Sequence, residues 1–199
     1  MKCACRGVTL IELLIALAIL GVLLALGVPS FTVGIANSRI RTTAEAIQNG
    51  LQLARAEAVK RNALIRFQLT SDLSATCVLS TTASNWIVSY DNAAGLCASA
   101  FIDEGLSPDL NAAPRIIQRR GATEGSRGAV IAADQSEIIF NGFGRVTNAA
   151  TNPVGIAVMP ISGVCTTQRC LNVTVSAGGQ VRMCDPQLTL TNPNDPQSC

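Results

Sequence analysis

The residues from Gly7 to Glu12, GVTLIE in one-letter code, lie between a short basic leader and a long apolar run. Glu12 is the only charged side chain between Val8 and Val28. An ionised carboxylate in such a segment costs about 2.5–3.5 kcal/mol on membrane insertion, so Glu12 needs a partner. A cut after Gly7 would give Val8 a free α-amino group, which could pair with Glu12 of a neighbouring subunit. We expect this pair to set the register of an assembly.

Six of the eight cysteines lie beyond the apolar run, and two, Cys3 and Cys5, lie in the leader. An even number of cysteines in an exported domain indicates disulfides formed in an oxidising compartment such as the periplasm. Six cysteines allow 15 connectivities, of which we favour local closure. The candidates would pair as Cys77 with Cys97, Cys165 with Cys170, and Cys184 with Cys199.

The sequence gives less support to two alternatives, a cysteine metal site and a different disulfide pairing. A metal site built from cysteines alone would need a Cys-x-x-Cys pair, which the exported part lacks. Pairing of Cys170 with Cys184 is disfavoured because a two-residue turn at Gly178-Gly179 would place Cys184 opposite Val173.

The remaining charged residues give no catalytic arrangement. The chain has no histidine, the usual general base near neutral pH and the commonest nitrogen ligand of zinc. Asp103 and Glu104 are adjacent, so their side chains would diverge on a strand, and no nucleophile and base accompany them. We expect no enzymatic activity, no cofactor and no metal. A cluster of arginines is either solvated or faces an acidic partner subunit: Arg115, Arg119, Arg120 and Arg127.

The apolar run that contains Glu12 and the segment after it are expected to form one long helix. The 21 residues from Val8 to Val28 form about 31 Å of helix, enough to span a bilayer. After Pro29 the apolar residues recur every three or four positions, which predicts one buried face: Ala36, Ile40, Ala44, Ile47, Leu51, Ala54 and Ala58. A single helix should run from Val8 to about Arg61, bent or loosened near residues 27–29.

From residue 63 the apolar period falls to two, which predicts strands. The expected strands cover residues 64–69, 77–80, 86–90, 116–118, 130–132, 137–140, 154–159, 170–176 and 180–184. Turns are expected at Asn141-Gly142 with Gly144, and at Gly178-Gly179. Residues 91–114 should form a long loop, and the tail from Pro186 should lack regular structure but be tied down by Cys199.

The N-terminal residues resemble the type IV pilin and pseudopilin class, whose processing signal is a glycine, an apolar residue and then Thr-Leu-Ile-Glu. This resemblance implies that a prepilin peptidase cleaves between Gly7 and Val8 and methylates the new amino group of Val8. Glu12 would then be the fifth residue of the mature chain and Pro29 the twenty-second, the positions that the class uses.

An ordinary secretory signal peptide is the alternative, with Lys2 and Arg6 as its basic region. It would place Glu12 inside the hydrophobic region, and the residues that follow offer a poor cleavage site. A lipoprotein signal does not fit, because both leader cysteines precede the apolar run.

Two further stretches resemble the GspH/FimT family: residues 44–62, which contain Ala54-Arg55-Ala56-Glu57-Ala58, and residues 140–145 with the glycine pair at 178–179. The implied fold class is α+β, a long N-terminal helix packed on an antiparallel β-sheet domain. The expected parts are a leader (1–7), a transmembrane and assembly half of the helix (8–29), an amphipathic half (30–62) and a periplasmic β-rich domain (63–199).

Some FimT-type minor pilins are thought to bind DNA through a Gly-Arg-x-Arg motif. The matching positions here run from Gly179 to Arg182, and glutamine replaces the first arginine. Arg145 could substitute only if the hairpins of Gly144 and Gly179 are adjacent. Residues 63–199 hold eight basic and ten acidic side chains, a net charge of −2, which disfavours DNA binding.

The sequence therefore predicts a minor pilin of a type IV pilus that acts in initiation or at the tip. An H-type minor pseudopilin of a type II secretion system is the main alternative, and DNA binding in natural transformation a lesser one. A third class is a membrane-bound binding protein that never polymerises. The expected partners are other pilin or pseudopilin subunits, prepilin peptidase and the inner membrane. The protein should cross the inner membrane once before it enters a filament.

Overall fold

The computed structural model describes residues 9–102, 114–124 and 128–199, with only the backbone at residues 26–30. The chain divides between Ile35 and Ala36 into an N-terminal unit and a C-terminal unit, each described by itself below. Gly7, Val8, Asp103, Glu104 and Arg127 lie outside the described residues.

Helix α1 (Leu10–Arg61) contributes to both units. Its helical backbone continues through residues 27–29, where the sequence suggested a bend or a loosening. Among the described residues, no helix combines the length and the apolarity that a membrane crossing requires. The helix ends where Asn62 adopts a positive φ of 46°, and the N–H groups of Asn62 and Ala63 donate to the carbonyls of Val59 and Ala58. This pair of bonds is the Schellman motif, which satisfies the last carbonyls of a helix.

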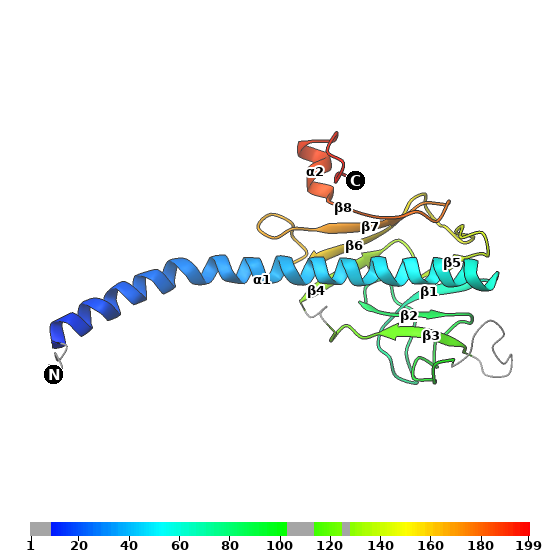
Figure 1. Cartoon of the computed structure of the whole chain (residues 1–199), viewed down its shortest axis with the longest axis horizontal. Helices are drawn as coiled ribbons and strands as arrows, with labels where there is room; N and C mark the ends of the chain where they lie inside the picture. Colours follow the sequence, from blue (N-terminus) through cyan, green and yellow to red (C-terminus); the bar gives the residue numbers. More distant parts are fainter. Residues whose placement is uncertain (1–8, 103–113, 125–127) are drawn as a thin grey trace, which may run out of the picture. The chain divides into compact units, whose positions relative to one another are not determined.

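Two antiparallel four-stranded sheets form the β part of the C-terminal unit (Figure 1). The first sheet has the order β3-β2-β1-β5, and the second has the order β4-β6-β7-β8. The strands are β1 (Ile65–Thr70), β2 (Asn85–Ser89), β3 (Ile116–Arg120), β4 (Ala129–Ala133), β5 (Glu137–Phe140), β6 (Val154–Pro160), β7 (Leu171–Val175) and β8 (Val181–Cys184). The expected α+β class is confirmed, with two sheets in the β part.

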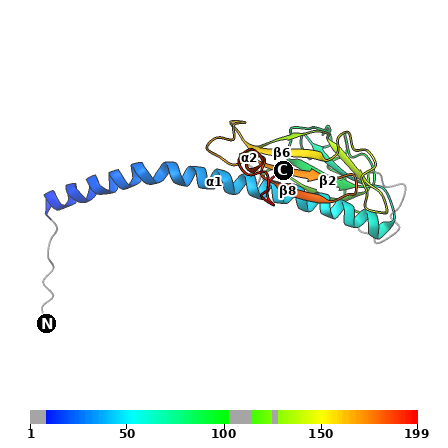
Figure 2. The same ribbon diagram turned by 90° about the horizontal axis from the view of Figure 1, so that it is seen from above.

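Both sheets lie on one side of α1 in the C-terminal unit (Figure 2). The helix face predicted from the sequence is buried from Ile40 onwards: Ile40, Ala44, Ile47, Leu51, Ala54 and Ala58 are fully or almost fully inaccessible. They share one core with Ile65 and Phe67 of β1, and with Ile156 of β6. The alanines allow close approach of the helix backbone, and the larger residues fill the space between the helix and the sheets.

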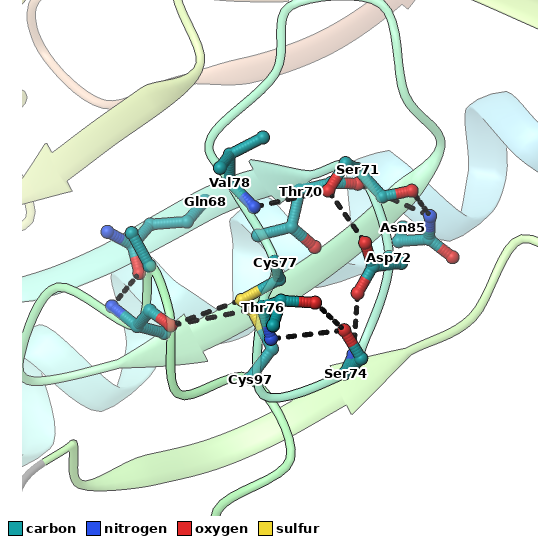
Figure 3. The surroundings of a disulfide bond; sticks show 12 residues. Gln68, Thr70, Ser71, Asp72, Ser74, Thr76, Cys77, Val78, Asn85 and Cys97 are labelled. Carbon is teal, nitrogen blue, oxygen red and sulfur yellow. Dashed lines mark hydrogen bonds between the residues drawn. A yellow bond between two sulfur atoms is a disulfide. The ribbon is translucent and has the colours of Figure 1, made fainter.

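The strand expected at 77–80 is absent, which corrects the sequence prediction. Only a single bridge joins Leu79 to Thr70 there. Asp72 accepts from the Ser74 N–H and the Ser71 hydroxyl, and Cys77 is bonded to the buried Cys97, as Figure 3 shows. These local bonds hold the segment as a loop around the disulfide.

The register of the last hairpin also differs from the prediction by one residue. Cys184 lies opposite Asn172, and Val173 lies opposite Met183. Only Gly179 of the glycine pair has a positive φ, 79°, and the Ser176 N–H bonds to the Gln180 carbonyl. The turn therefore has three residues between the bonded pair, and the two-residue turn that needs two positive φ values is not formed.

The tail contains a short helix, α2 (Pro186–Thr191), where no regular structure was expected. The side chain of Asp185 caps its start by accepting from the Gln187 N–H at 2.9 Å. A proline at the first helical position after a capping aspartate is a normal helix start. The signal was therefore present in Asp185-Pro186, although the other prolines of the tail suggested an irregular segment.

Candidate assembly helix and the junction at its end

The first turn of α1 is capped by its own side chains. The Glu12 N–H donates to the Thr9 hydroxyl at 3.3 Å, and the Leu13 N–H donates to the Thr9 carbonyl at 3.2 Å. Threonine with glutamate three residues later is the spacing of a capping box. Glu12 is exposed, and its carboxylate lies in the first turn, where the helix dipole favours negative charge. The side chain is therefore available to a partner outside this chain.

The large apolar side chains of the N-terminal unit are exposed along the described stretch from Leu10 to Leu24. Each of them has an exposed fraction of at least 50%: Leu10, Ile11, Leu13, Leu14, Ile15, Leu17, Ile19, Leu20, Val22, Leu23 and Leu24. Consecutive helical residues are rotated by about 100°, so this set covers every face of the helix. A helix that is apolar all round belongs in a lipid or protein environment.

Pro29, the other residue assigned to assembly, lies within α1. Its side chain is outside the described part of the structure.

Three segments that carry the GspH/FimT resemblance meet at one junction. The Arg55 Nε of α1 donates to the Gly144 carbonyl at 3.2 Å, and a Cβ on Gly179 would collide with that same carbonyl. The Val146 N–H donates to the Ala177 carbonyl at 3.1 Å. The hairpins of Gly144 and Gly179 are therefore adjacent. The sequence did not single out Arg55 as the residue that holds them to α1.

A second cluster surrounds Tyr90 near the end of α1. The guanidinium carbons of Arg61 and Arg115 lie 5.6 and 4.7 Å from the centre of its ring. Arg115 also pairs with Asp91, with an Nη2–Oδ1 distance of 2.7 Å. The hydrogen bonds and charge of Arg115 outweigh burial and hold the pKa of Asp91 below its usual value.

Glu57 joins this cluster through an ion pair with Arg61. Burial raises the pKa of Glu57. The hydrogen bond and charge of Arg61, together with Lys60, lower that pKa by more than burial raises it, so the net shift is downward. The Arg61 Nη1 donates to the Tyr90 hydroxyl at 3.3 Å, and this contact connects the end of α1 to the segment that follows β2.

The other members of the arginine cluster bond to backbone carbonyls. Arg119 donates to the carbonyls of Cys97 and Ser99, each at 2.8 Å, and Arg120 donates to the Glu124 carbonyl at 2.7 Å. Within the described residues, then, these arginines hold loops of their own chain.

The six cysteines that follow the apolar run form three disulfides: Cys77–Cys97, Cys165–Cys170 and Cys184–Cys199. These are the pairs that local closure predicted. Cys77 and Cys97 are buried in a small cluster with Ile87, Ala93 and Ile116, while Cys199 fastens the tail to the end of β8. No group of three or more potential metal ligands occurs among the described residues.

The two candidate DNA contacts differ in their surroundings. Arg145 is exposed, next to the junction of the two hairpins. The Arg182 Nη2 donates to the carbonyls of Pro196 and Ser198, each at 2.7 Å. Arg182 therefore binds the tail of its own chain, and any DNA contact would have to compete with those bonds.

An open groove of about 650 Å³ lies between α1, the β7–β8 pair and the tail. Arg41 and Arg169 line it, with side-chain exposed fractions of 72% and 60%. Arg169 is 3.5 Å from the buried carboxylate of Asp185, and Arg41 is 2.8 Å from Glu45. Sequence reasoning did not find this groove, because its walls come from segments far apart in the chain.

Solved structures with similar folds include a minor pilin and a minor pseudopilin. The type IV minor pilin FimU of Pseudomonas aeruginosa is 14% identical, with a TM-score of 0.45 over 72% of this chain and 90% of FimU. The minor pseudopilin EpsH of the Vibrio cholerae type 2 secretion system is 16% identical, with a TM-score of 0.42 over 74% of this chain and 98% of EpsH. No curated protein sequence matches the chain significantly.

Two family models match the chain. The model of the prokaryotic N-terminal methylation motif covers residues 2–28, and the model described as type II transport protein GspH covers residues 43–179. The second match spans more than half of the chain and includes the helix end and both hairpins of the junction. The chain therefore belongs to the GspH family, within the structural class of pilins and pseudopilins.

Proposed function

We propose that the protein is a minor pilin of a type IV pilus, built into the initiation or tip complex of the filament through α1. The observation that carries this proposal is the apolar surface of α1, exposed by at least half on each large side chain from Leu10 to Leu24. Such a surface needs an apolar environment on all sides. Lipid supplies it before assembly, and the helices of neighbouring subunits supply it in the filament.

Processing prepares the helix for this role. Prepilin peptidase cleaves between Gly7 and Val8 and methylates the new amino group, as the match to the N-terminal methylation motif supports. The apolar run then holds the protein in the inner membrane as a single-pass subunit, with the C-terminal unit in the periplasm. Cleavage is required because the charged leader would otherwise occupy the position of the new amino terminus.

Glu12 sets the register of assembly. Apolar contacts between helices in lipid have little directional preference, because the lipid tails are as apolar as leucine. An exposed carboxylate in the first turn of α1 can pair with the amino group of Val8 on a neighbouring subunit. One such pair per subunit distinguishes a single register from the others.

An H-type minor pseudopilin of a type II secretion system would use the same helix and the same processing. The cysteine-rich C-terminal unit and its fastened tail lead us to place the pilus first, while disulfides themselves suit both the periplasm and the cell exterior. A clean deletion in the native host, scored for surface pili with twitching and for release of secreted enzymes, separates the two. Loss of pili with normal secretion is the expected result; loss of secretion with normal pili would overturn the pilus assignment.

A further inference from the structure

We propose that the surface at the C-terminal end of α1 is a docking site for an acidic neighbouring subunit of the filament, with Phe143 as its apolar anchor. We call this surface the helix-end patch; it consists of Phe143, Val59 and Leu64, all within the C-terminal unit. The inference rests on the proposed function as a filament subunit. It adds a contact between subunits that is separate from the apolar run of α1.

The three large side chains of the helix-end patch are exposed although they are apolar. Phe143 has an exposed fraction of 85%, and Val59 and Leu64 of 52% each. Val59 lies beside the hairpin that follows β5, because a Cβ on Gly144 would be 3.2 Å from its Cγ2. Leu64 directly precedes β1, which pairs with β5. A single exposed apolar side chain is ordinary on a protein surface, but several around one hairpin indicate an interaction site.

The backbone of the hairpin holds Phe143 in its exposed position. The Asn141 side chain accepts from the N–H groups of Phe143 and Arg145, at 3.0 and 3.1 Å, and the Asn141 N–H donates to the Arg145 carbonyl at 3.0 Å. A Cβ on Gly142 would collide with Asn62, so the turn also packs against the end of α1. Docking therefore requires little further ordering of the backbone, which lowers its entropic cost. Aromatic side chains are enriched at the centres of protein interfaces.

The charged side chains around the helix-end patch are mainly basic. Residues 55–64 and 141–146 contain four basic side chains and one acidic side chain, so the local net charge is +3: Arg55, Lys60, Arg61 and Arg145 against Glu57. Glu57 has a side-chain exposed fraction of 13% and pairs with Arg61 and Lys60. Arg55 and Arg145 are exposed. This surface complements a partner that presents carboxylates around an apolar depression.

A protein partner fits the helix-end patch better than a nucleic acid does. Val59 and Leu64 are aliphatic and offer no ring on which a base could stack. Arg182, the other candidate DNA contact, bonds to carbonyls of its own tail. The net charge of −2 on residues 63–199 also opposes a phosphate backbone. An acidic protein surface would use both the apolar and the basic part of the patch.

The first test puts the photoreactive amino acid p-benzoylphenylalanine in place of Phe143 in the full chain, expressed in the native host. Irradiation of intact cells should crosslink the chain to another subunit of the pilin class, identified by mass spectrometry of the joined peptides. The matched control carries the same amino acid in place of Leu190 on α2, where the exposed fraction is 88%. No crosslink, a crosslink to a protein outside the pilin class, or equal crosslinking from both positions overturns the inference.

The charge of the partner is tested in the same cells. Arg145→Glu should reduce the crosslink at least about fivefold, and Arg145→Lys should retain it. A lysine in place of a carboxylate of the crosslinked partner segment should restore the crosslink of the Arg145→Glu chain. An undiminished crosslink in the Arg145→Glu chain would contradict an acidic partner.

The second test measures incorporation into sheared filaments. Phe143→Asp should lower it at least about tenfold, whereas Leu190→Asp, at an equally exposed position, should be incorporated normally. Normal incorporation of Phe143→Asp overturns the docking site alone. Absence of the unsubstituted chain from the filaments overturns the proposed function and this inference with it. Loss of DNA retardation by Phe143→Asp, without a crosslink to a subunit, overturns the inference in favour of a nucleic acid.

Discussion

At the scale of single residues, the contact between Gly144 and Gly179 decides how the two hairpins meet. Gly179 has a φ of 79°, and a Cβ there would collide with the Gly144 backbone carbonyl, which cannot rotate away as a side chain could. That carbonyl also accepts the hydrogen bond from Arg55. A side chain at residue 179 would therefore disturb both hairpins and their bond to α1.

We expect Gly179→Ala to lower the free energy of unfolding by about 2–4 kcal/mol, from the left-handed backbone and the collision together. Gly163→Ala is the matched control, because φ is 67° there and the space is open. It should cost about 1 kcal/mol. Urea denaturation of the purified protein measures the free energy of unfolding of both variants. Equal decreases would show that the backbones at Gly144 and Gly179 are not in close contact.

Substitutions of Arg182 and Arg145 distinguish a structural role of these side chains from a role in DNA binding. Arg182→Ala removes two bonds to tail carbonyls and should increase hydrogen exchange of the tail amides about tenfold, the equivalent of about 1.4 kcal/mol, whereas Arg145→Ala should leave the tail unchanged. If the two arginines form a DNA site instead, both substitutions should weaken salt-sensitive retention of DNA. Gel retardation of the same variants tests that.

The pair of Asp91 and Arg115 gives stability a pH dependence. The pKa of Asp91 is lower in the folded chain than in the unfolded chain, so its contribution is present above about pH 4 and is lost as the pH falls through the folded value. Asp91→Asn should destabilise the protein by up to about 1 kcal/mol at pH 6, because the pair is partly exposed to solvent. The difference from the unsubstituted chain should shrink in denaturation curves as the pH falls below about 4; a constant difference would contradict it.

At the scale of elements, α1 packs closely on the first sheet at Gly50. A Cβ at this position would lie 2.8 Å from Phe67 and 3.1 Å from Trp86, whose rings are themselves in contact with centres 5.7 Å apart. Glycine weakens a helix interior by about 1 kcal/mol relative to alanine, so its presence here is explained by packing.

Gly50→Ala should therefore destabilise the C-terminal unit by about 1–3 kcal/mol in spite of the better helix propensity of alanine. Gly34 lies in the same helix, and a Cβ there would meet open space. Gly34→Ala should therefore not destabilise the C-terminal unit. Thermal unfolding followed by near-ultraviolet circular dichroism reports the packing of Trp86. An increase in melting temperature for Gly50→Ala would refute the close contact.

At the scale of the whole molecule, α1 contains two apolar segments, one that is buried in its own chain and one that is exposed. From Ile40 to Ala58 the apolar face of α1 is buried within its own chain, and from Leu10 to Leu24 the apolar side chains are exposed. The first set stabilises the C-terminal unit. The second set is left for lipid and for other subunits in the proposed function.

Glu12→Ala should separate these two roles. The substitution lies outside the C-terminal unit, so the free energy of unfolding of that unit should not change. Incorporation into filaments should fall at least about tenfold, as expected for the loss of one buried ion pair. Normal incorporation of the variant in sheared pilus fractions would remove the proposed role of Glu12. Absence of the unsubstituted chain itself from those fractions would instead favour a membrane-bound binding protein that never polymerises.

The sequence by itself determined the features that depend on neighbouring residues. The apolar period of α1 between Ile40 and Ala58, most of the strands and the three disulfides between nearby cysteines were all predictable, because hydrophobic periodicity and short loop closure are local properties. The N-terminal motif likewise indicated the class, because it is a continuous stretch of neighbouring residues. Asp185-Pro186 is also a local signal for a helix start, but the later prolines of the tail led to the prediction of an irregular segment.

Only the tertiary structure decided the features that join distant segments. These are the division of the strands into two sheets, the meeting of Gly144 with Gly179 under Arg55, and the groove between Arg41 and Arg169. The register of the last hairpin belongs with them, because two adjacent glycines permit several turns and the packing of the junction selects one. Such contacts depend on the relative placement of whole elements, which the spacing of residues along the chain does not specify.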